Sequence, residues 1–127
     1  MSSKTDQPRT LCVDFDGVIH SYNSPWTGAT QIPDAPVKGA FEWLESMVQY
    51  FTVAIFSSRS KESGGINAMI EWLTRHGLPP HVMTKLCFPT EKPAAVLYID
   101  DRAWQFHGPG TMPTKADIEG FKPWNRR

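Results

Sequence analysis

Two aspartates separated by a single residue lie near the start of the chain. Asp14 and Asp16 follow the apolar run of residues 11–13, and Gly17 comes next. Two carboxylates at this spacing raise each other's pKa unless a positive charge lies between them. Carboxylate oxygens are typical ligands of magnesium, so the pair is a candidate Mg²⁺ site. The alternative interpretation is a helix-capping aspartate beside an ordinary surface aspartate.

Further along the chain, other reactive side chains occupy similar positions. The polar residues that directly follow an apolar run are Ser57, Ser58, Arg59, Asp100 and Asp101. Lys92 lies shortly before the run that leads into Asp100. A hydroxyl, a lysine and several carboxylates are the groups that phosphoryl transfer needs, because it combines a nucleophile, charge neutralisation and proton transfer.

These side chains can meet only if the apolar runs are neighbouring strands of one sheet. The segments 11–13, 52–56 and 94–99 are nearly all apolar, as strands buried on both faces require. Helical spacing of apolar residues in 37–51 and 66–73 separates them. This alternation predicts an α/β fold, a three-layer Rossmann-like parallel sheet with helices on both faces. Ligands of such sheets bind at the carboxyl ends of the strands.

Three further segments are less regular. Residues 20–36 are rich in turn-forming residues and predict an ordered loop, in which Tyr22 and Trp26 line the entrance to a site or simply pack. A third strand is expected within residues 81–87. A short helix or an edge segment is expected within residues 115–121.

The composition indicates a single domain. The chain has 127 residues, with 13 basic and 13 acidic side chains and a formal net charge of zero. We expect a flexible tail at residues 1–10 and one catalytic domain at residues 11–127. The charge balance gives no support for a nucleic-acid or membrane partner. Cys12 and Cys87 lack metal-ligand spacing and are expected to be reduced core thiols. No signal-peptide or membrane-spanning pattern is present, so we expect a cytoplasmic location.

The run Asp14-Phe15-Asp16-Gly17-Val18-Ile19 resembles the first motif of the haloacid dehalogenase superfamily of phosphohydrolases. The other three motifs of that family follow in the family's order. Ser57 matches the hydroxyl that ends a strand, Lys92 matches the motif lysine, and Asp100 with Asp101 matches the acidic pair. The resemblance covers most of the chain.

The resemblance implies a role for each matched residue. Asp14 is expected to attack phosphorus and form an aspartyl-phosphate, and Asp16 to act as general acid and base. Lys92 is expected to offset the negative charge. The implied Mg²⁺ ligands are Asp14, Asp16, Asp100 and Asp101, with Asp101 as the more direct ligand of the acidic pair. The residues expected at the substrate phosphate are Gly17, Ser57, Ser58 and Arg59.

Three of these roles have alternatives within the sequence. Ser57 could be a simple strand-end hydroxyl. Lys85 could take the place of Lys92 as the motif lysine. Arg59 could form a salt bridge or remain solvated instead of touching the substrate.

Asp16 also bears on the type of reaction. In the family, dehalogenases lack an aspartate at this position because halide leaves without a proton, whereas phosphatases keep it to protonate an alkoxide. The resemblance therefore implies phosphoryl chemistry and not dehalogenation. Asp16 alone does not separate a phosphatase from a phosphomutase, but a mutase usually carries a larger cap domain, and we expect a Mg²⁺-dependent phosphomonoester hydrolase. The intervals between the motifs hold one helix each and leave no room for a cap domain, which resembles the small capless members. Such an open site suits a phosphorylated macromolecule, a nucleotide, a nucleic-acid end or a small phosphoester, or closure by a second copy of the chain.

Two other functions remain open from the sequence. A receiver-type phospho-acceptor module has similar length, an acidic metal site and a Lys-Pro pair like Lys92-Pro93. Its acidic pair ends the first strand, however, whereas here the pair comes last. A catalytically weak phosphate-binding protein on the same fold is the third possibility.

Overall fold

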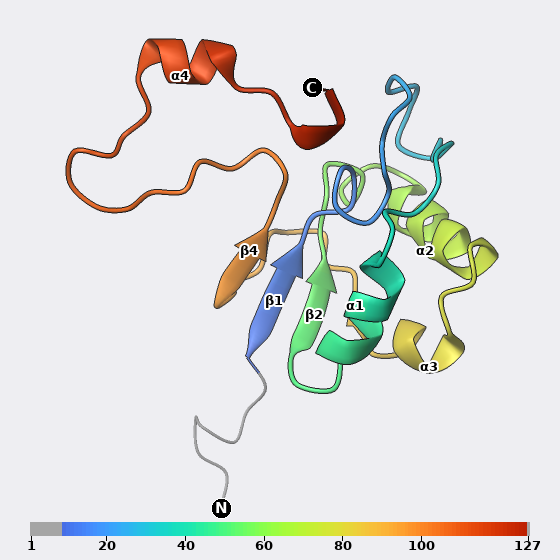
Figure 1. The fold of residues 1–127 in the computed structure, drawn as a ribbon. Helices are drawn as coiled ribbons and strands as arrows, with labels where there is room; N and C mark the ends of the chain where they lie inside the picture. The colour runs from blue at the N-terminus through green and yellow to red at the C-terminus, as the bar shows by residue number, and fades with distance from the viewer. Residues whose placement is uncertain (1–8, 127) are drawn as a thin grey trace, which may run out of the picture.

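The computed structural model describes residues 9–126 (Figure 1). The strands are β1 (Thr10–Val13), β2 (Thr52–Ile55), β3 (Leu86–Cys87) and β4 (Leu97–Ile99). The helices are α1 (Ala40–Met47), α2 (Gly65–Arg75), α3 (Pro80–Met83) and α4 (Lys115–Gly120), and a 3-10 turn covers Trp124–Arg126. Most of the expected N-terminal tail lies outside the described residues. Its last residue, Thr10, already belongs to β1.

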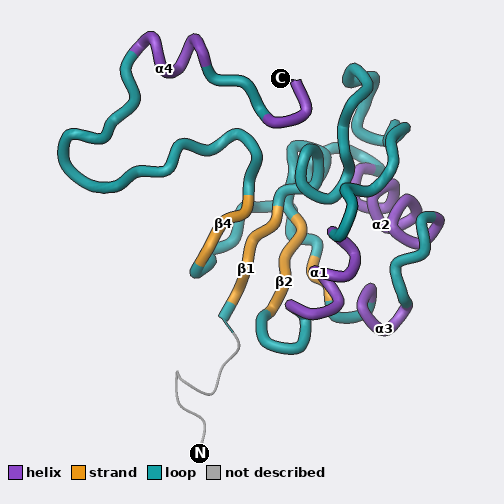
Figure 2. Tube along the Cα trace, in the orientation of Figure 1, coloured by secondary structure: helices purple, strands orange, loops and turns teal. Residues whose placement is uncertain are grey.

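The four strands form one parallel sheet in the order β3-β2-β1-β4 (Figure 2). In this register Val13 at the end of β1 lies between Ile55 of β2 and Ile99 of β4. The chain runs from β1 to β2 to β3 in one direction and then returns to β4 on the other side of β1. The predicted α/β class and parallel sheet are confirmed. Open α/β sheets bind ligands where the strand order reverses, here between β1 and β4.

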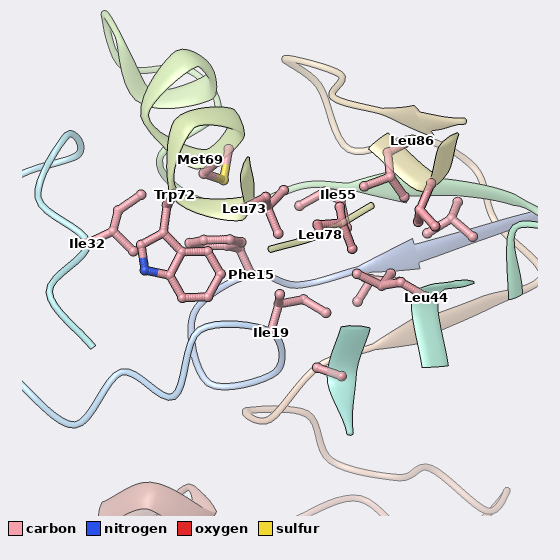
Figure 3. Packing of buried hydrophobic residues seen from close by; sticks show 14 of the residues in the cluster. Phe15, Ile19, Ile32, Leu44, Ile55, Met69, Trp72, Leu73, Leu78 and Leu86 are labelled. Carbon is pink, nitrogen blue, oxygen red and sulfur yellow. The ribbon is translucent and has the colours of Figure 1, made fainter. Parts of the chain in front are cut away.

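One face of the sheet carries the hydrophobic core (Figure 3). Because strand residues alternate between faces, Leu11 and Val13 point to the same side, and both belong to the core cluster. α1, α2 and α3 all contribute buried side chains to this cluster. Trp72 of α2 is fully buried and makes edge-to-face contacts with Phe15 and with Phe41 of α1, at ring-centroid distances of 5.2 and 6.1 Å. The first three helices therefore form one layer.

The opposite face has no helical layer within residues 9–126, which corrects the expectation of helices on both faces. Cys12 points to this face, where it lines a cavity together with Lys92 and Tyr98. The connection from β3 to β4 crosses here, behind β1 and β2 in Figure 1, without regular secondary structure in residues 88–96. Because the chain reverses its direction across the sheet, a right-handed crossover must use this face.

The structure also corrects three local expectations. Residues 81–87 are not one strand, because Pro80 begins the short helix α3 and only Leu86 and Cys87 pair with β2. Cys87 is exposed instead of buried, although Cys12 is a buried thiol as expected. The predicted short helix near residues 115–121 is present as α4, which buries no side chain.

Candidate functional site

Three carboxylates meet where the strand order reverses. Asp14 directly follows β1, and its backbone N–H donates to the carbonyl of Ile99 at the end of β4 at 2.9 Å. This pairing brings Asp14 beside Asp100 and Asp101, so that oxygens of the three carboxylates lie within 4.8 Å of one another. Burial, followed by the charges of Asp100 and Asp101, raises the pKa of Asp14 to about 8. Without a cation, the folded chain therefore holds a proton at this site.

Of the three carboxylates, that of Asp101 has the fewest hydrogen-bond partners. Both of its carboxylate oxygens are buried and accept no hydrogen bond from an N–H or hydroxyl group of the described residues, so the carboxyl group of Asp14 is the one placed to share a proton with them. Burial raises the pKa of Asp101. A buried acceptor without a donor costs about 1–3 kcal/mol, and more when it is charged. Asp100 is exposed and accepts a hydrogen bond from the backbone N–H of Arg102 at 2.8 Å.

Gly17 makes the position of Asp101 possible. Its φ is +86°, a conformation that glycine adopts without strain. A Cβ atom built on Gly17 would lie 2.1 Å from Oδ2 of Asp101. The backbone N–H of Gly17 donates to the carbonyl of His20 at 2.7 Å, and its carbonyl accepts from the Trp124 indole at 2.6 Å. Gly17 thus accommodates an acidic side chain, and its own polar groups are engaged within the chain.

The residues present fit a hard divalent cation such as Mg²⁺. Asp14, Asp100 and Asp101 offer oxygen ligands only, which is the donor type that Mg²⁺ prefers. The buried oxygens of Asp101 have no N–H or hydroxyl donor within residues 9–126, and a cation would take the place of the proton that they share with Asp14. A cation would also remove the repulsion that raises the pKa of Asp14.

Asp16 lies in a different electrostatic environment, although it is only two residues from Asp14. Its carboxylate accepts hydrogen bonds from Arg59 Nε at 2.9 Å and Nη2 at 3.1 Å, and it lies 2.8 Å from His20 Nδ1. These contacts outweigh the opposing effect of burial and lower the pKa of Asp16. The three carboxylates gathered for a metal are those of Asp14, Asp100 and Asp101, and the Asp16 side chain, which was also expected to be a metal ligand, pairs with Arg59 and His20 instead.

Arg59 is a buried structural residue and not a phosphate-binding one. Only 1% of its surface is exposed. Besides the two bonds to Asp16, its Nη1 donates to the carbonyls of Gly28, Ala29 and Gln31 at 2.9–3.1 Å. These bonds fix the loop of residues 20–36 against the carboxyl end of β2. Of the alternatives that the sequence left open for Arg59, the structure shows the salt bridge.

Ser57 and Lys92 line one cavity beside Asp14. This cavity of 180 Å³ also includes Ser58 and Asp100. The Ser57 hydroxyl accepts from the backbone N–H of Arg59 at 2.9 Å, which holds it in place while its own proton remains free to donate. The ammonium group of Lys92 lies over the ring of Tyr98 at 4.6 Å.

Lys85, the alternative motif lysine, directly precedes β3. In a parallel sheet this places it at the edge opposite to the carboxyl ends of the strands. The structure therefore brings Lys92, and not Lys85, to the carboxylates.

A second cavity, of 260 Å³, also includes Asp14 and Ser58 but lies on the side of Asp16. Tyr22, Trp26 and Arg102 complete its lining. Sequence reasoning missed Arg102. The signal available was its position directly after the acidic pair, because residues beyond a strand's carboxyl end commonly reach the site.

The end of the described chain packs against the loop that carries Asp16 and Gly17. Besides the bond from Trp124, Nδ2 of Asn125 donates to the carbonyls of Ser21 and Tyr22, both at 2.9 Å. Tyr22 has a φ of +55°, which is uncommon for a residue other than glycine. The aromatic tail was expected to pack on the domain, but Trp104, Phe106 and Trp124 all remain about half exposed, and Trp124 contacts the Gly17 loop through its indole N–H.

No protein-family model, curated protein or solved structure matches the chain. Among residues 9–126, no helix is long and apolar enough to cross a membrane. Any assignment of function therefore depends on the chemistry of the site.

Proposed function

We propose that the protein is a Mg²⁺-dependent phosphomonoester hydrolase of the capless haloacid dehalogenase type, acting through an aspartyl-phosphate. The observation that carries this proposal is the carboxylate group of Asp14, Asp100 and Asp101, in which both oxygens of Asp101 are buried without a donor. The proposal departs from the family's three-layer fold on one face of the sheet, where the irregular segment of residues 88–96 takes the place of a helix.

Asp14 is the nucleophile of the proposed reaction. One of its carboxylate oxygens forms a bond to phosphorus, and the bond between phosphorus and the alcohol oxygen breaks. Water then attacks phosphorus and releases inorganic phosphate and free Asp14. A bound Mg²⁺, held by Asp14, Asp100 and Asp101, would supply positive charge against the phosphoryl oxygens and keep Asp14 ionised.

Asp16 serves proton transfer in this scheme. It lines the same cavity as Asp14, and 12% of its side chain is exposed. Arg59 and His20 lower its pKa, so it is ionised and suited to take a proton from the attacking water. The same ion pairing opposes its protonation, so proton donation to the leaving alcohol is the weaker half of its role. Substrates with good leaving groups should therefore react fastest.

Ser57 and Lys92 contribute binding and charge neutralisation. The Ser57 hydroxyl donates to a phosphoryl oxygen from a buried, fixed position. Lys92 is exposed and mobile enough on its long stem to approach the phosphate from the same cavity. Together they offset the negative charge that three carboxylates and a phosphate bring to one place.

The test is turnover of an activated aryl phosphate by the full chain, with Mg²⁺ and then with a chelator. We expect many turnovers with Mg²⁺ and loss of activity on chelation, restored by added Mg²⁺. Asp14→Asn should abolish turnover and covalent labelling while leaving the protein folded by circular dichroism. Asp117→Asn, which removes the charge of an exposed carboxylate in the N-terminal cap of α4, is the control and should retain activity.

Two outcomes would reject the proposal. Undiminished activity after complete removal of divalent metal would exclude the metal role of the carboxylates. Stoichiometric labelling of Asp14 without turnover would instead support the receiver-type module.

A further inference from the structure

The second cavity beside Asp14 is suited to the leaving group of the substrate. Asp14 and Ser58 line both cavities, so the two open onto the same carboxylate. The smaller one holds Ser57 and Lys92, the hydroxyl and the cation suited to a phosphoryl group. The larger one holds Asp16, the proposed site of proton transfer. An ester bound with phosphorus at Asp14 therefore directs its alcohol into the larger cavity.

Aromatic surface is available on the wall of this cavity. One face of the Trp26 indole packs on the guanidinium of Arg59, at 4.5 Å from the ring centroid, and 44% of Trp26 is exposed. Because Arg59 is itself held by five hydrogen bonds, the indole has a fixed support. The ring of Tyr22 contacts the guanidinium of Arg126, which is itself exposed, at 4.9 Å from the ring centroid, and the ring of His20 at a centroid distance of 5.9 Å.

The backbone of Tyr22 gives independent support. Its φ of +55° is unfavourable for a bulky side chain, and Asn125 Nδ2 holds its carbonyl at 2.9 Å. Conformations of this kind cost of the order of 1–3 kcal/mol and persist at functional sites. Tyr22, with this backbone conformation, lines the cavity that Asp14 and Asp16 share.

Arg102 adds a cation to the same wall. The hydrogen bond found for this residue is that of its backbone N–H, and no carboxylate of residues 9–126 forms an ion pair with its guanidinium. Its charge acts on Asp101 through space. An exposed arginine whose guanidinium forms no ion pair within residues 9–126, in a cavity that two aromatic side chains also line, fits a ligand that is both planar and anionic.

We propose, on the basis of the phosphatase function proposed above, that this cavity binds a nucleoside as the leaving group. The substrate is then the phosphomonoester end of a nucleic-acid strand. Its terminal base stacks on Trp26 and Tyr22, and the neighbouring internucleotide phosphate pairs with Arg102. The neutral charge of the whole chain does not oppose this, because one local cation suffices for one phosphate. Stacking of a base on an aromatic side chain contributes roughly 1–3 kcal/mol.

The test compares a terminally phosphorylated dinucleotide with the same compound lacking its terminal base. Both 3′- and 5′-phosphates are measured. We expect kcat/KM to favour the base-bearing compound by about 5- to 150-fold, the equivalent of the 1–3 kcal/mol that base stacking usually contributes. Trp26→Leu should reduce this preference toward one, and Trp26→Phe should retain most of it. Trp104→Leu, which removes a similarly exposed tryptophan that does not line this cavity, should leave the preference intact.

Arg102 is tested through the dependence of KM on salt. Loss of one phosphate contact should reduce the slope of log affinity against log salt concentration by roughly 0.7 for a single strand. Arg102→Gln should show this change. Arg75→Gln, at the exposed end of α2, should not.

Binding of the unphosphorylated dinucleotide separates this inference from the phosphatase proposal. Its contact with the Trp26 indole N–H, followed by NMR and assigned with Trp26→Phe, requires no catalysis. Binding there without hydrolysis of any phosphomonoester would reject the phosphatase and keep the cavity assignment. Hydrolysis with equal kcat/KM for the base-bearing and base-free compounds would overturn the cavity assignment. A phosphotyrosine peptide preferred over every dinucleotide would also overturn it.

Discussion

At the scale of single residues, the site separates two neighbouring aspartates into opposite protonation states. Asp14 lies among carboxylates and out of water, which raises its pKa to about 8. Asp16 lies against Arg59 and His20, which lower its pKa. A pair of titratable groups with pKa values driven apart is typical of sites in which one group reacts and the other moves protons. The cause lies in side chains distant in sequence and not in the Asp-x-Asp spacing itself.

The buried pair of Arg59 and Asp16 leads to a stability prediction. Arg59→Met keeps much of the side-chain volume but leaves Asp16 without its main cation and frees three loop carbonyls. Breaking a buried ion pair in this way costs about 3–5 kcal/mol. Urea unfolding should show this loss.

The control for this prediction is Arg75→Met, which changes an exposed arginine at the end of α2. Surface changes of this kind usually stay within about 0.5 kcal/mol. A loss below about 1 kcal/mol for Arg59→Met would mean that the pair does not hold the loop of residues 20–36 in place.

At the scale of elements, the sequence was sufficient where local pattern decides the structure. The apolar runs became β1, β2 and β4, and the polar residues after them met at one edge because the strands are parallel. The helical layer expected on the second face does not form. Pro89 and Pro93 interrupt residues 88–96, where proline lacks the N–H that a helix needs and its ring obstructs the preceding turn.

Contacts between distant segments could not be predicted in this way. Asp16 and Arg59 are 43 positions apart, and the Trp124 indole reaches Gly17 across 107 positions. Neither contact has a periodic signal in the sequence. From the sequence, Arg59 could form a salt bridge or contact the substrate. Only the structure distinguishes these alternatives, because residues 28–31 pass around the guanidinium and accept its hydrogen bonds.

Gly17, in the turn after β1, gives a second prediction. Gly77, which follows α2, provides a matched control for it. Both have positive φ, +86° and +92°, so alanine is strained at either position. A Cβ at Gly77 meets nothing within 4 Å, whereas at Gly17 it meets the Asp101 carboxylate. Gly77→Ala should cost about 1–2 kcal/mol of stability through its backbone alone. Gly17→Ala should cost more and should also weaken Mg²⁺ binding.

Isothermal titration with Mg²⁺ and thermal unfolding measure both effects of these variants. We expect Gly77→Ala to bind Mg²⁺ like the original chain, and Gly17→Ala to lose at least about tenfold, the equivalent of 1.4 kcal/mol. Equal Mg²⁺ affinity in the two variants would show that Asp101 does not depend on the space that Gly17 leaves.

At the scale of the whole molecule, the strand order, the loops and the chain end all converge on one edge of the sheet. β1 and β4 bring Asp14 to the acidic pair, and Arg59 after β2 holds the loop that carries Trp26. The 3-10 turn at the chain end holds Ser21 and Tyr22 through Asn125. No cap covers this edge within residues 9–126, which is consistent with the size of the substrate proposed above.

The same convergence of carboxylates makes the stability of the protein depend on pH and on metal. In the metal-free folded state Asp14 keeps its proton up to about pH 8, whereas its ordinary pKa is 3.8. Between these values the folded state binds more protons than the unfolded state, so stability falls as the pH rises from about 4 to about 8. The raised pKa of Asp101 acts in the same direction. Asp16 acts in the opposite sense, but its lowered pKa confines that effect to pH values below about 4.

Mg²⁺ should reverse this loss, because it binds the ionised carboxylates of the folded state. At a hundred times its Kd a ligand stabilises the folded state by about 2.7 kcal/mol. We expect the rise in Tm on adding Mg²⁺ to be small at pH 5, where protons compete for the carboxylates, and several degrees at pH 8. Thermal unfolding over this pH range, with and without Mg²⁺, measures both effects.

Asp14→Asn should flatten the pH dependence of the metal-free protein and reduce the Mg²⁺ shift. An equal Mg²⁺ shift at pH 5 and pH 8, retained in Asp14→Asn, would place the metal elsewhere on the molecule.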